Sequence, residues 1–503
     1  MVLYRWNLKI VVILMVVAFG TGCHHTNKIE YESLYSIGAT VLGINTVVDS
    51  LDVPWEICWG PDDNIWFTEQ SGSISRYDFR TGLRKRLLFL EDTYRMRTSG
   101  LLGMALHTDM KRYPYVFVAY TAQTVKDKHV SKIVRFTYAH DTLINPLLIL
   151  EYAAWSGHFG ARVTVAPDGK LMVATGDGAQ FENAQDTLSP HGKILRFNID
   201  GTIPNDNPIP GSPVWAYGLR NPQGLAYDSK GTLYVSDHGD ATDDEVNRII
   251  RGRNYGWPHV EGYTDKEKEV EFAGQHSGIT EPMIAWTPTV APSGIAVYES
   301  GAIPEFSNSL LLATLKGNGL RVLKLNGQGD KIVSDSVLFR QVFGRLRSVC
   351  VSPGGEVYIG TSNKDWNPNG FAGERDDRII RISKVETEAA NRQHILPAVV
   401  KNADKDVVSR GELLYSSYCA SCHKENGRGL SGVYPALYGS SLVGDADKRD
   451  LLRLVMGGKK EMPAFDFLSN QDLAVVLSYV RKRFGPQASA VSEQEIKALR
   501  GGG

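Results

Sequence analysis

Short alternating runs of apolar and polar residues recur along most of the chain and predict β-strands. From about residue 41 to residue 384 one pattern occurs six times: an apolar strand, a turn rich in Pro, Asp or Gly, and a second apolar strand. Each copy is followed by a further strand-like run, and no segment of helical periodicity interrupts the series. The copies begin at Glu56, Gly100, Arg162, Gln223, Ser293 and Arg347.

Repeats of about 45 to 70 residues with several strands each are typical of a β-propeller, in which every blade needs its neighbours to bury its faces. We therefore predict a mainly β fold with a six-bladed propeller. A β-sandwich is the structural alternative, but it would not repeat the same turn chemistry six times.

The fourth copy lies within residues 217–247 and carries charged groups at both ends of its hairpin. Because a hairpin returns to its starting point, Arg220 and Asn221 should lie near Asp237 and His238. The equivalent positions of all blades should face one rim near the central channel. They are Thr98, Ser99, His158, Asp177, Arg220, Asn221, Asp237, His238, Lys316, Arg345 and Arg347. Three arginines, a lysine and a histidine in this set indicate a binding site for an anionic, planar or oxygen-rich ligand.

The chain changes character after residue 384, where a polar stretch that reads as a linker precedes a helix-like segment and the motif Cys-Ala-Ser-Cys-His. This motif, Cys419 to His423, is the attachment signature of c-type haem, although the pentapeptide alone could also be a redox or zinc pair. Residues 406–484 resemble a class I cytochrome c, with Gly411 and Tyr415 before the motif and a closing amphipathic helix from Asp472.

The axial ligands implied by this resemblance are His423 and a methionine. Met462 is preferred because it forms a Met-Pro pair in the loop before the last helix, and Met456 is the competing candidate.

The N-terminus has the features of an export signal: basic Arg5 and Lys9, then an apolar run over residues 10–19 that is too short to span a bilayer. Small residues precede Cys23 and resemble a bacterial lipoprotein cleavage box, with Gly20 in place of the usual leucine. We therefore expect a chain that is lipid-anchored through Cys23 at the periplasmic face of a membrane, with an ordinary secretory signal as the alternative.

The formal net charge is -1 in 503 residues, so a nucleic acid is not favoured as a partner. Cys58 and Cys350 belong to neither motif. They could pair in an oxidising compartment, or they could be two buried thiols in apolar strands.

The predicted propeller resembles the soluble quinoprotein sugar dehydrogenases, also called glucose/sorbosone dehydrogenases, which use pyrroloquinoline quinone (PQQ). The resemblance covers residues 41–384, and its main motifs are GLLGMALH, HFGAR, PDGKLMVATGD, GLRNPQGLAY, DDEVNRI, NYGWP, LKGNG and RLRSV. It implies PQQ, calcium and a sugar substrate.

The resemblance also implies individual roles. His158 matches the general base and Asp177 the carboxylate beside it, while Arg220 matches the residue at the quinone oxygens. The remaining cofactor positions are Asn221, Gln223, Thr289, Lys316, Arg345 and Arg347. Gly239 and Asp240 match a calcium site at the cofactor, and Glu245, the Tyr255 carbonyl and Asp265 resemble the ligands of a second calcium ion.

Two departures concern the sugar side of the site. Thr98 replaces a glutamine of the glucose-active members, and Trp286 lies one residue from their aromatic position. The identity of the sugar therefore stays open.

These observations predict a quinohaemoprotein that oxidises an aldose or related polyol and passes electrons to its own haem, bound through Cys419 and Cys422, and then to a downstream cytochrome or respiratory-chain component. The alternatives are a calcium-dependent hydrolase of the lactonase type and a non-catalytic carbohydrate-binding propeller that carries a haem. The expected parts are a signal peptide (1–22), a tether (23–40), the propeller (41–385), a linker (386–405), the cytochrome c domain (406–485) and a polar tail (486–503).

Overall fold

The structure is a computed structural model, which describes most of the chain after residue 30. The described ranges are 31–125, 128–155, 157–276, 278–365, 372–386, 395–398, 410–424, 426–429, 434–459, 462, 464–466, 468–485 and 489–500. The predicted signal peptide and the predicted lipid-anchored Cys23 therefore lie outside the described residues.

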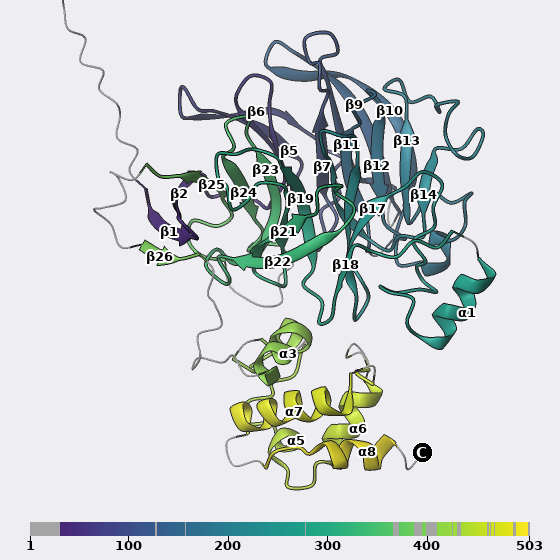
Figure 1. Cartoon of the computed structure of the whole chain (residues 1–503), viewed down its shortest axis with the longest axis vertical. Coiled ribbons are helices and arrows are strands. Elements are labelled where there is room, and N and C mark those ends of the chain that lie inside the picture. Colours follow the sequence, from purple (N-terminus) through teal and green to yellow (C-terminus); the bar gives the residue numbers. More distant parts are fainter. Residues whose placement is uncertain are drawn as a thin grey trace, which may run out of the picture. The chain divides into compact units, whose positions relative to one another are not determined.

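Six antiparallel sheets form the propeller within the described residues, and each of the six predicted hairpins supplies the two inner strands of one blade (Figure 1). Blade one contains β3 (Pro54–Trp59), β4 (Ile65–Glu69), β5 (Ser73–Asp78) and β6 (Leu83–Phe89). Blade two contains β7 (Leu101–Leu106), β8 (Tyr115–Val125), β9 (Lys128–Ala139) and β10 (Thr142–Ala154). Blade three contains β11 (Gly160–Val165), β12 (Leu171–Thr175), β13 (Lys193–Phe197) and β14 (Val214–Tyr217). The prediction of a six-bladed propeller is confirmed.

Blades four to six have the same four-stranded arrangement, and a strand from the N-terminal part of the chain completes blade six. Blade four contains β15 (Pro222–Tyr227), β16 (Leu233–Asp237), β17 (Asp244–Ile249) and β18 (Ile284–Trp286). Blade five contains β19 (Pro292–Tyr298), β20 (Ser309–Thr314), β21 (Gly319–Leu325) and β22 (Ile332–Leu338). Blade six contains β23 (Leu346–Val351), β24 (Val357–Thr361) and β25 (Ile379–Lys384), and its fourth strand is β2 (Thr40–Val48). Pairing of β2 with β25 closes the ring, because the two ends of the propeller chain share one sheet.

The inner strands of neighbouring blades lie side by side around the ring, from β3 through β7, β11, β15, β19 and β23 back to β3. Gly103 shows how closely they pack, since a Cβ atom at this position would collide with the Ala161 carbonyl of the next blade. Apolar side chains fill the space between the sheets. One such cluster includes Trp55, Phe117 and Val163, which come from blades one, two and three.

Two further strands extend blade six. Figure 1 shows β1 (Ser33–Ile37) beside β2, and β26 (Ile395–Pro397) pairs in parallel with β1. The predicted linker over residues 386–405 thus contains a short strand that belongs to a blade. Ala398 continues this attachment, because its N–H donates to the Ser36 carbonyl at 2.9 Å.

The C-terminal domain is helical, as predicted. Its helices are α3 (Arg410–Tyr418), α4 (Ala420–His423), α5 (Ser441–Gly444), α6 (Arg449–Gly457), α7 (Asn470–Phe484) and α8 (Glu493–Arg500). Ser469 caps α7 by accepting the Asp472 N–H at 3.1 Å. Gly411 lets α3 cross α7 closely, since a Cβ atom there would lie 2.6 Å from the Val475 carbonyl.

Two helices form in segments where the sequence did not predict a helix. The propeller series is interrupted by α1 (Glu267–Gln275), whose charged sequence has no continuous apolar stripe. The predicted tail over residues 486–503 contains α8, which packs through the fully buried Ile496 and whose Glu495 pairs with Lys448 at 2.8 Å. A single buried apolar side chain in eight residues is too weak a periodic signal to predict a helix.

Cys58 and Cys350 are free thiols in the structure. Both are partly buried and do not pair with each other, and burial raises the pKa of both thiols. Among the described residues we find no helix that is both long and apolar enough to cross a bilayer.

Candidate functional site

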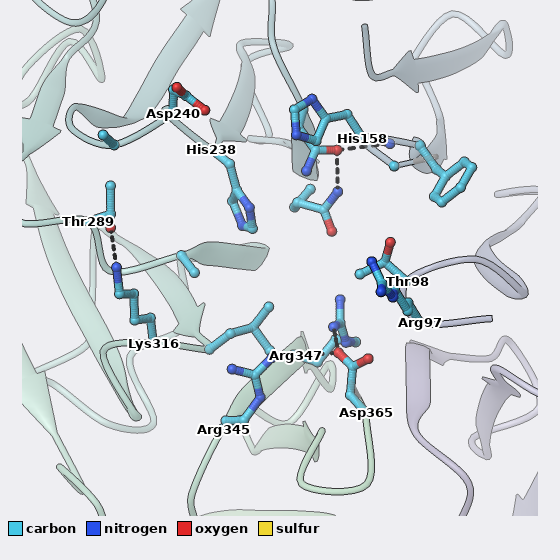
Figure 2. A pocket seen from close by; sticks show the side chains of 18 of the residues that line it. Arg97, Thr98, His158, His238, Asp240, Thr289, Lys316, Arg345, Arg347 and Asp365 are labelled. Carbon is cyan, nitrogen blue, oxygen red and sulfur yellow. Dashed lines mark hydrogen bonds and ion pairs between the residues drawn. The ribbon is translucent and has the colours of Figure 1, made fainter. Parts of the chain in front are cut away.

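A pocket lies at the end of the inner hairpins where the sequence predicted a polar rim. All six blades contribute to it, because each hairpin delivers the residues that flank its two strands. The propeller side chains that line it include Trp55, Arg97, Thr98, His158, Asn221, Gln223, His238, Asp240, Thr289, Lys316, Arg345, Arg347 and Asp365 (Figure 2). Seven of the eleven predicted rim residues line this pocket, whereas Ser99, Asp177, Arg220 and Asp237 are not among its lining residues.

His158 and Asp177 form a hydrogen-bonded pair on blade three. His158 precedes β11 and Asp177 follows β12, and the imidazole Nδ1 lies 2.7 Å from Asp177 Oδ1. Asp177 is completely buried. Its Oδ1 also accepts the Ala179 N–H at 2.7 Å, and its Oδ2 accepts the Trp257 indole N–H at 2.8 Å. With Nδ1 held as the donor to this carboxylate, Nε2 of His158 carries the lone pair that can accept a proton.

The fourth hairpin joins Arg220 and Asn221 to Asp237 as predicted. The backbone N–H groups of Arg220 and Asn221 donate to the Asp237 carboxylate at 2.9 and 2.6 Å. Burial raises the pKa of Asp237 to about 7, and these two N–H groups act in the opposite direction. Asp237 therefore fixes the backbone from which the side chains of Arg220 and Asn221 project.

Asn221 links this hairpin to the segment that contains His158 and Gly160. Its Oδ1 accepts the Gly160 N–H at 3.1 Å and the Gln223 amide at 3.0 Å. The Arg220 guanidinium binds Asp240 at 2.5 Å and lies over the Trp257 ring, 5.2 Å from its centroid. The Arg220 side chain is nearly buried, and Arg220 is not among the residues that line the pocket.

Cationic side chains gather on the side of the pocket formed by blades five and six (Figure 2). Lys316 donates to Thr289 Oγ1 at 2.7 Å. Arg347 pairs with the buried Asp365 and donates to Ser362 Oγ at 2.9 Å, and Arg345 lies 3.6 Å from the same carboxylate. One carboxylate thus holds two guanidinium groups, which leaves an excess of positive charge for an anionic ligand.

The positions matched to calcium ligands divide into two groups. Gly239 and Asp240 follow β16 at the pocket, where the Gly239 N–H donates to Asp244 Oδ1 at 2.9 Å. Glu245 lies on β17 and accepts from Asn247 at 2.7 Å and from the Gly262 N–H at 2.8 Å. Burial and the nearby Asp237 raise the pKa of Glu245 to about 8.

Tyr255 and Asp265 lie in the long segment between β17 and β18. The Tyr255 hydroxyl donates to the Arg248 carbonyl at 2.6 Å, and the Asp265 N–H donates to Glu269 at 3.4 Å. The described residues contain no group of three or more His, Cys, Asp or Glu side chains with the geometry of a metal site. Both calcium sites therefore stay predictions.

Three residues of the site were not assigned a role from the sequence. Trp257 lies 80 residues from Asp177, and its motif NYGWP was recognised only as a family landmark. Asp365 lies between β24 and β25 of blade six, in a segment without a distinctive pattern. Lys193 begins β13 and reads as an ordinary strand residue, yet its side chain is fully buried.

The Lys193 side chain binds backbone carbonyls of the loop that follows Asp177. Its ammonium group donates to the carbonyls of Asn183, Ala184 and His191 at 2.7, 2.9 and 2.5 Å. Burial lowers its pKa to about 7, whereas Asp186 and Asp177 act in the opposite direction. The ammonium group thus ties both ends of this loop to the blade.

We expect Lys193→Met to lower the free energy of unfolding by about 2–4 kcal/mol, because three buried carbonyls lose their donor while the methionine keeps the volume. Urea unfolding followed by tryptophan fluorescence measures the change. Lys331→Met is the matched control, since this lysine is exposed and its change should stay within about 0.5 kcal/mol. Equal midpoints for the two variants would contradict the role given to Lys193.

The C-terminal domain contains a second, largely apolar cavity of about 440 Å³. Cys419, Cys422, His423 and Met462 all line it, whereas Met456 is not among the lining residues. Nδ1 of the buried His423 lies 2.9 Å from the Pro435 carbonyl. A carbonyl can only accept, so Nδ1 carries the proton and Nε2 is left free to bind a metal. The cavity therefore places the predicted attachment residues and both predicted axial ligands around one apolar space.

Comparison with known proteins gives two family matches. Residues 51–367 match the family described as "Glucose / Sorbosone dehydrogenase", and residues 406–480 match "Cytochrome C oxidase, cbb3-type, subunit III". Quinoprotein glucose dehydrogenase B of Acinetobacter calcoaceticus is 30% identical over 398 residues, which cover 62% of this chain and 83% of that protein. Aldose sugar dehydrogenase YliI of Escherichia coli is 28% identical over 346 residues, which cover 65% of this chain and 91% of that protein.

Among solved structures, the PQQ-bound form of aldose sugar dehydrogenase from Streptomyces coelicolor is 32% identical, with a TM-score of 0.60. The match covers 68% of this chain and 98% of that one. The similarity therefore extends over the whole of that propeller.

Proposed function

The chain belongs to the glucose/sorbosone dehydrogenase family and carries a cytochrome c domain, and from this premise we propose that it is a PQQ-dependent quinohaemoprotein that oxidises an aldose or related polyol. The observation that carries this proposal is the pocket, which sets a histidine–aspartate pair against a cluster of cations. A hydrolase of the lactonase type has no use for that cluster or for the haem motif.

The donor set fits PQQ. This cofactor has three carboxylates and a planar quinone, and it supplies an acceptor for two electrons when bound. Lys316, Arg345 and Arg347 would hold the carboxylates, with Thr289 beside Lys316. Asn221 and Gln223 would face the quinone oxygens, because the hydrogen bonds of Asn221 to Gly160 and Gln223 fix both side chains near His158. Arg220, which directly precedes Asn221, is proposed to contact the same oxygens.

Calcium would bind at two places. The carbonyls at Gly239 and Asp240 would serve an ion at the cofactor, where calcium acts as a Lewis acid. Glu245, the Tyr255 carbonyl and Asp265 would hold a second ion. The raised pKa of Glu245 fits this assignment, because a cation beside that buried carboxylate would stabilise its charged form.

His158 is the proton acceptor in this proposal. Its Nε2 would take the proton of the sugar hydroxyl at the carbon that is oxidised. Asp177 would keep the imidazole in the required tautomer and stabilise the imidazolium, as its contact with Nδ1 and its full burial allow. Trp257 would hold the other oxygen of Asp177 and so fix the plane of the carboxylate.

Electrons from the sugar would then pass to the haem on the same chain. Cys419 and Cys422 would form the thioether bonds, and His423 and Met462 would bind the iron. A haem tethered to its donor has a high effective concentration, so a diffusing first acceptor is unnecessary. A cytochrome or another respiratory-chain component would follow. We also propose export and lipid anchoring at Cys23, which the sequence before the described residues supports.

The test is reconstitution of the full-length protein, produced with its haem, by adding PQQ and calcium and following the haem spectrum with a panel of sugars. We expect haem reduction only when cofactor, calcium and an aldose are all present, and a chelator added before PQQ should abolish it. Lactone hydrolysis without haem reduction would favour the hydrolase, and sugar binding without either reaction would favour a binding protein.

A further inference from the structure

The last helix, α8, is an integral part of the C-terminal domain. It begins with a capping box, in which the Ser492 N–H donates to Glu495 Oε2 at 2.7 Å and the Glu495 N–H donates to Ser492 Oγ at 3.3 Å. The helix packs against α6 and α7 (Figure 1), and its Ile496 is completely buried in the apolar cluster of the domain. Both its start and its packing face are therefore defined by contacts within the domain.

Polar contacts also fix the first turn of α8 and the segment before it. Ser478 of α7 binds Val491 twice, because its Oγ accepts the Val491 N–H at 2.8 Å and donates to the Val491 carbonyl at 3.1 Å. Lys448, which precedes α6, donates to the Ala490 carbonyl at 2.5 Å and to Glu495 at 2.8 Å. The N-terminal end of α8 is thus tied both to α7 and to the start of α6.

The last residue of α8, Arg500, contacts the segment between α6 and α7. Its Nη2 donates to the Asp466 carbonyl at 2.5 Å and to the Leu468 carbonyl at 2.7 Å. One guanidinium nitrogen that binds two carbonyls two residues apart restricts the backbone between them, because both acceptors must stay within reach of the same donor. Arg500 therefore holds the turn formed by these residues.

The same segment, residues 458–469, carries Met462, and we call it the methionine loop. Met462 lies in a tight turn, since its N–H donates to the Lys459 carbonyl at 3.1 Å and its carbonyl accepts the Lys459 N–H at 2.9 Å. The Phe465 N–H donates to the Val455 carbonyl of α6 at 3.0 Å, and the Leu468 N–H donates to the Phe465 carbonyl at 3.2 Å. Met462, Phe465 and Leu468 all line the apolar cavity.

The stability of the methionine loop affects how firmly its methionine can bind a metal. Among its described residues the loop has one isolated bridge, between Lys459 and Met462, and no helix or strand. Segments with few backbone hydrogen bonds open at a small cost in free energy. The apparent affinity of a ligand falls with the fraction of time that its binding conformation is populated. Contacts that keep the loop closed therefore strengthen the binding of Met462 to iron.

We propose that α8 is a clamp for the methionine loop, with Arg500 as a positioning residue that keeps Met462 within reach of the haem iron. The inference rests on the proposed function, because it takes Met462 as the axial ligand. Arg500 acts through backbone carbonyls, so position 500 requires a donor that reaches both of them. Retention of the ligand then depends on a helix that lies outside the haem-attachment motif.

The first test measures how readily imidazole displaces Met462 from the ferric haem of the full-length protein, without sugar or PQQ. In Arg500→Ala the apparent dissociation constant for imidazole should fall about fivefold, because two charge-assisted hydrogen bonds at the surface are lost and the loop opens more often. Arg500→Lys keeps a donor and should give a value between those of Arg500→Ala and the unmodified protein. The shift of the Soret band reports the displacement.

Lys497→Ala is the matched control, since Lys497 is exposed on the same helix, one turn before Arg500, and pairs with Glu493 at 3.4 Å. The substitution removes the same charge but no contact with the methionine loop, so the imidazole constant should change less than about 1.5-fold. Equal changes in the two variants would overturn the clamp, because charge alone would then explain them. An unchanged constant in Arg500→Ala would overturn it as well.

Hydrogen exchange followed by mass spectrometry gives a second measurement on the haem-loaded protein. In Arg500→Ala the amides of residues 464–469 should exchange about fivefold faster. The amides of residues 489–500 should keep their protection, because Ile496 and the capping box still hold α8. Faster exchange over both stretches would show that the whole helix is lost, and it would overturn the specific role of Arg500.

These measurements separate the clamp from the proposed function, because neither of them uses sugar. If sugars are oxidised and the haem is reduced, but Arg500→Ala and Lys497→Ala behave alike in both measurements, the clamp is wrong and the proposed function stands. If no sugar is oxidised but the two variants still differ as expected, the proposed function fails and the clamp stands. An axial methionine from α6 in place of Met462 would overturn the clamp together with that ligand assignment.

Discussion

Replacing His158 by asparagine should lower sugar-dependent haem reduction by about 10²–10⁴-fold, because the reaction loses its proton acceptor. Asparagine fits the backbone at this position, where φ is +50°. We expect PQQ to bind with nearly unchanged affinity, since the proposed carboxylate ligands Lys316, Arg345 and Arg347 are untouched. The measurements are the rate of haem reduction at saturating sugar and the titration of PQQ by fluorescence quenching.

His140→Asn is the matched control for this variant. His140 is exposed and also has a positive φ, of +51°, so the substitution places the same strain on the backbone far from the pair. Its activity should equal that of the unmodified protein. A wild-type rate in His158→Asn would remove the proposed mechanism and favour a non-catalytic sugar-binding propeller.

The second large effect concerns the haem iron. Met462→Ala should remove the sixth ligand, convert the low-spin spectrum to a high-spin one, and lower the reduction potential by on the order of 100 mV, within the range of about 0.8 V that axial ligands span. The structure favours Met462 because it lines the same cavity as His423, whereas Met456 does not. Haem reduction by sugar should slow accordingly.

Met456→Ala is the matched control, since both methionines are partly buried against the same apolar cluster. It should keep the low-spin spectrum and the potential. The opposite result, with loss of the sixth ligand only in Met456→Ala, would show that the ligand comes from α6.

Most of the fold could be predicted from the local pattern of apolar and polar residues in the sequence. Each of the six predicted hairpins forms, because apolar alternation and turn residues act over only a few positions. The exceptions are weak local signals: α1 and α8 lack a broad apolar stripe, and β26 is three residues long and gains its stability by pairing with β1. Segments of this kind take their structure from partners that are distant in the sequence.

The sequence also predicted only part of the candidate site. The sequence placed His158, Asp177 and the cations at equivalent blade positions, and the closed ring brings them to one rim. It did not identify the partners of these residues. Trp257, which fixes Asp177, and Asp365, which pairs with Arg347, come from segments without a periodic pattern.

By itself, the sequence determined the repeated hairpin, the haem-attachment motif and the positions of the ionisable rim residues, because spacing and residue type are properties of short segments. Only the tertiary structure decided which carboxylate faces which cation, which carbonyls enclose Lys193, and which indole binds Asp177. These contacts form when neighbouring blades pack and loops fold over their ends, and burial then selects hydrogen-bonding partners that no local pattern encodes.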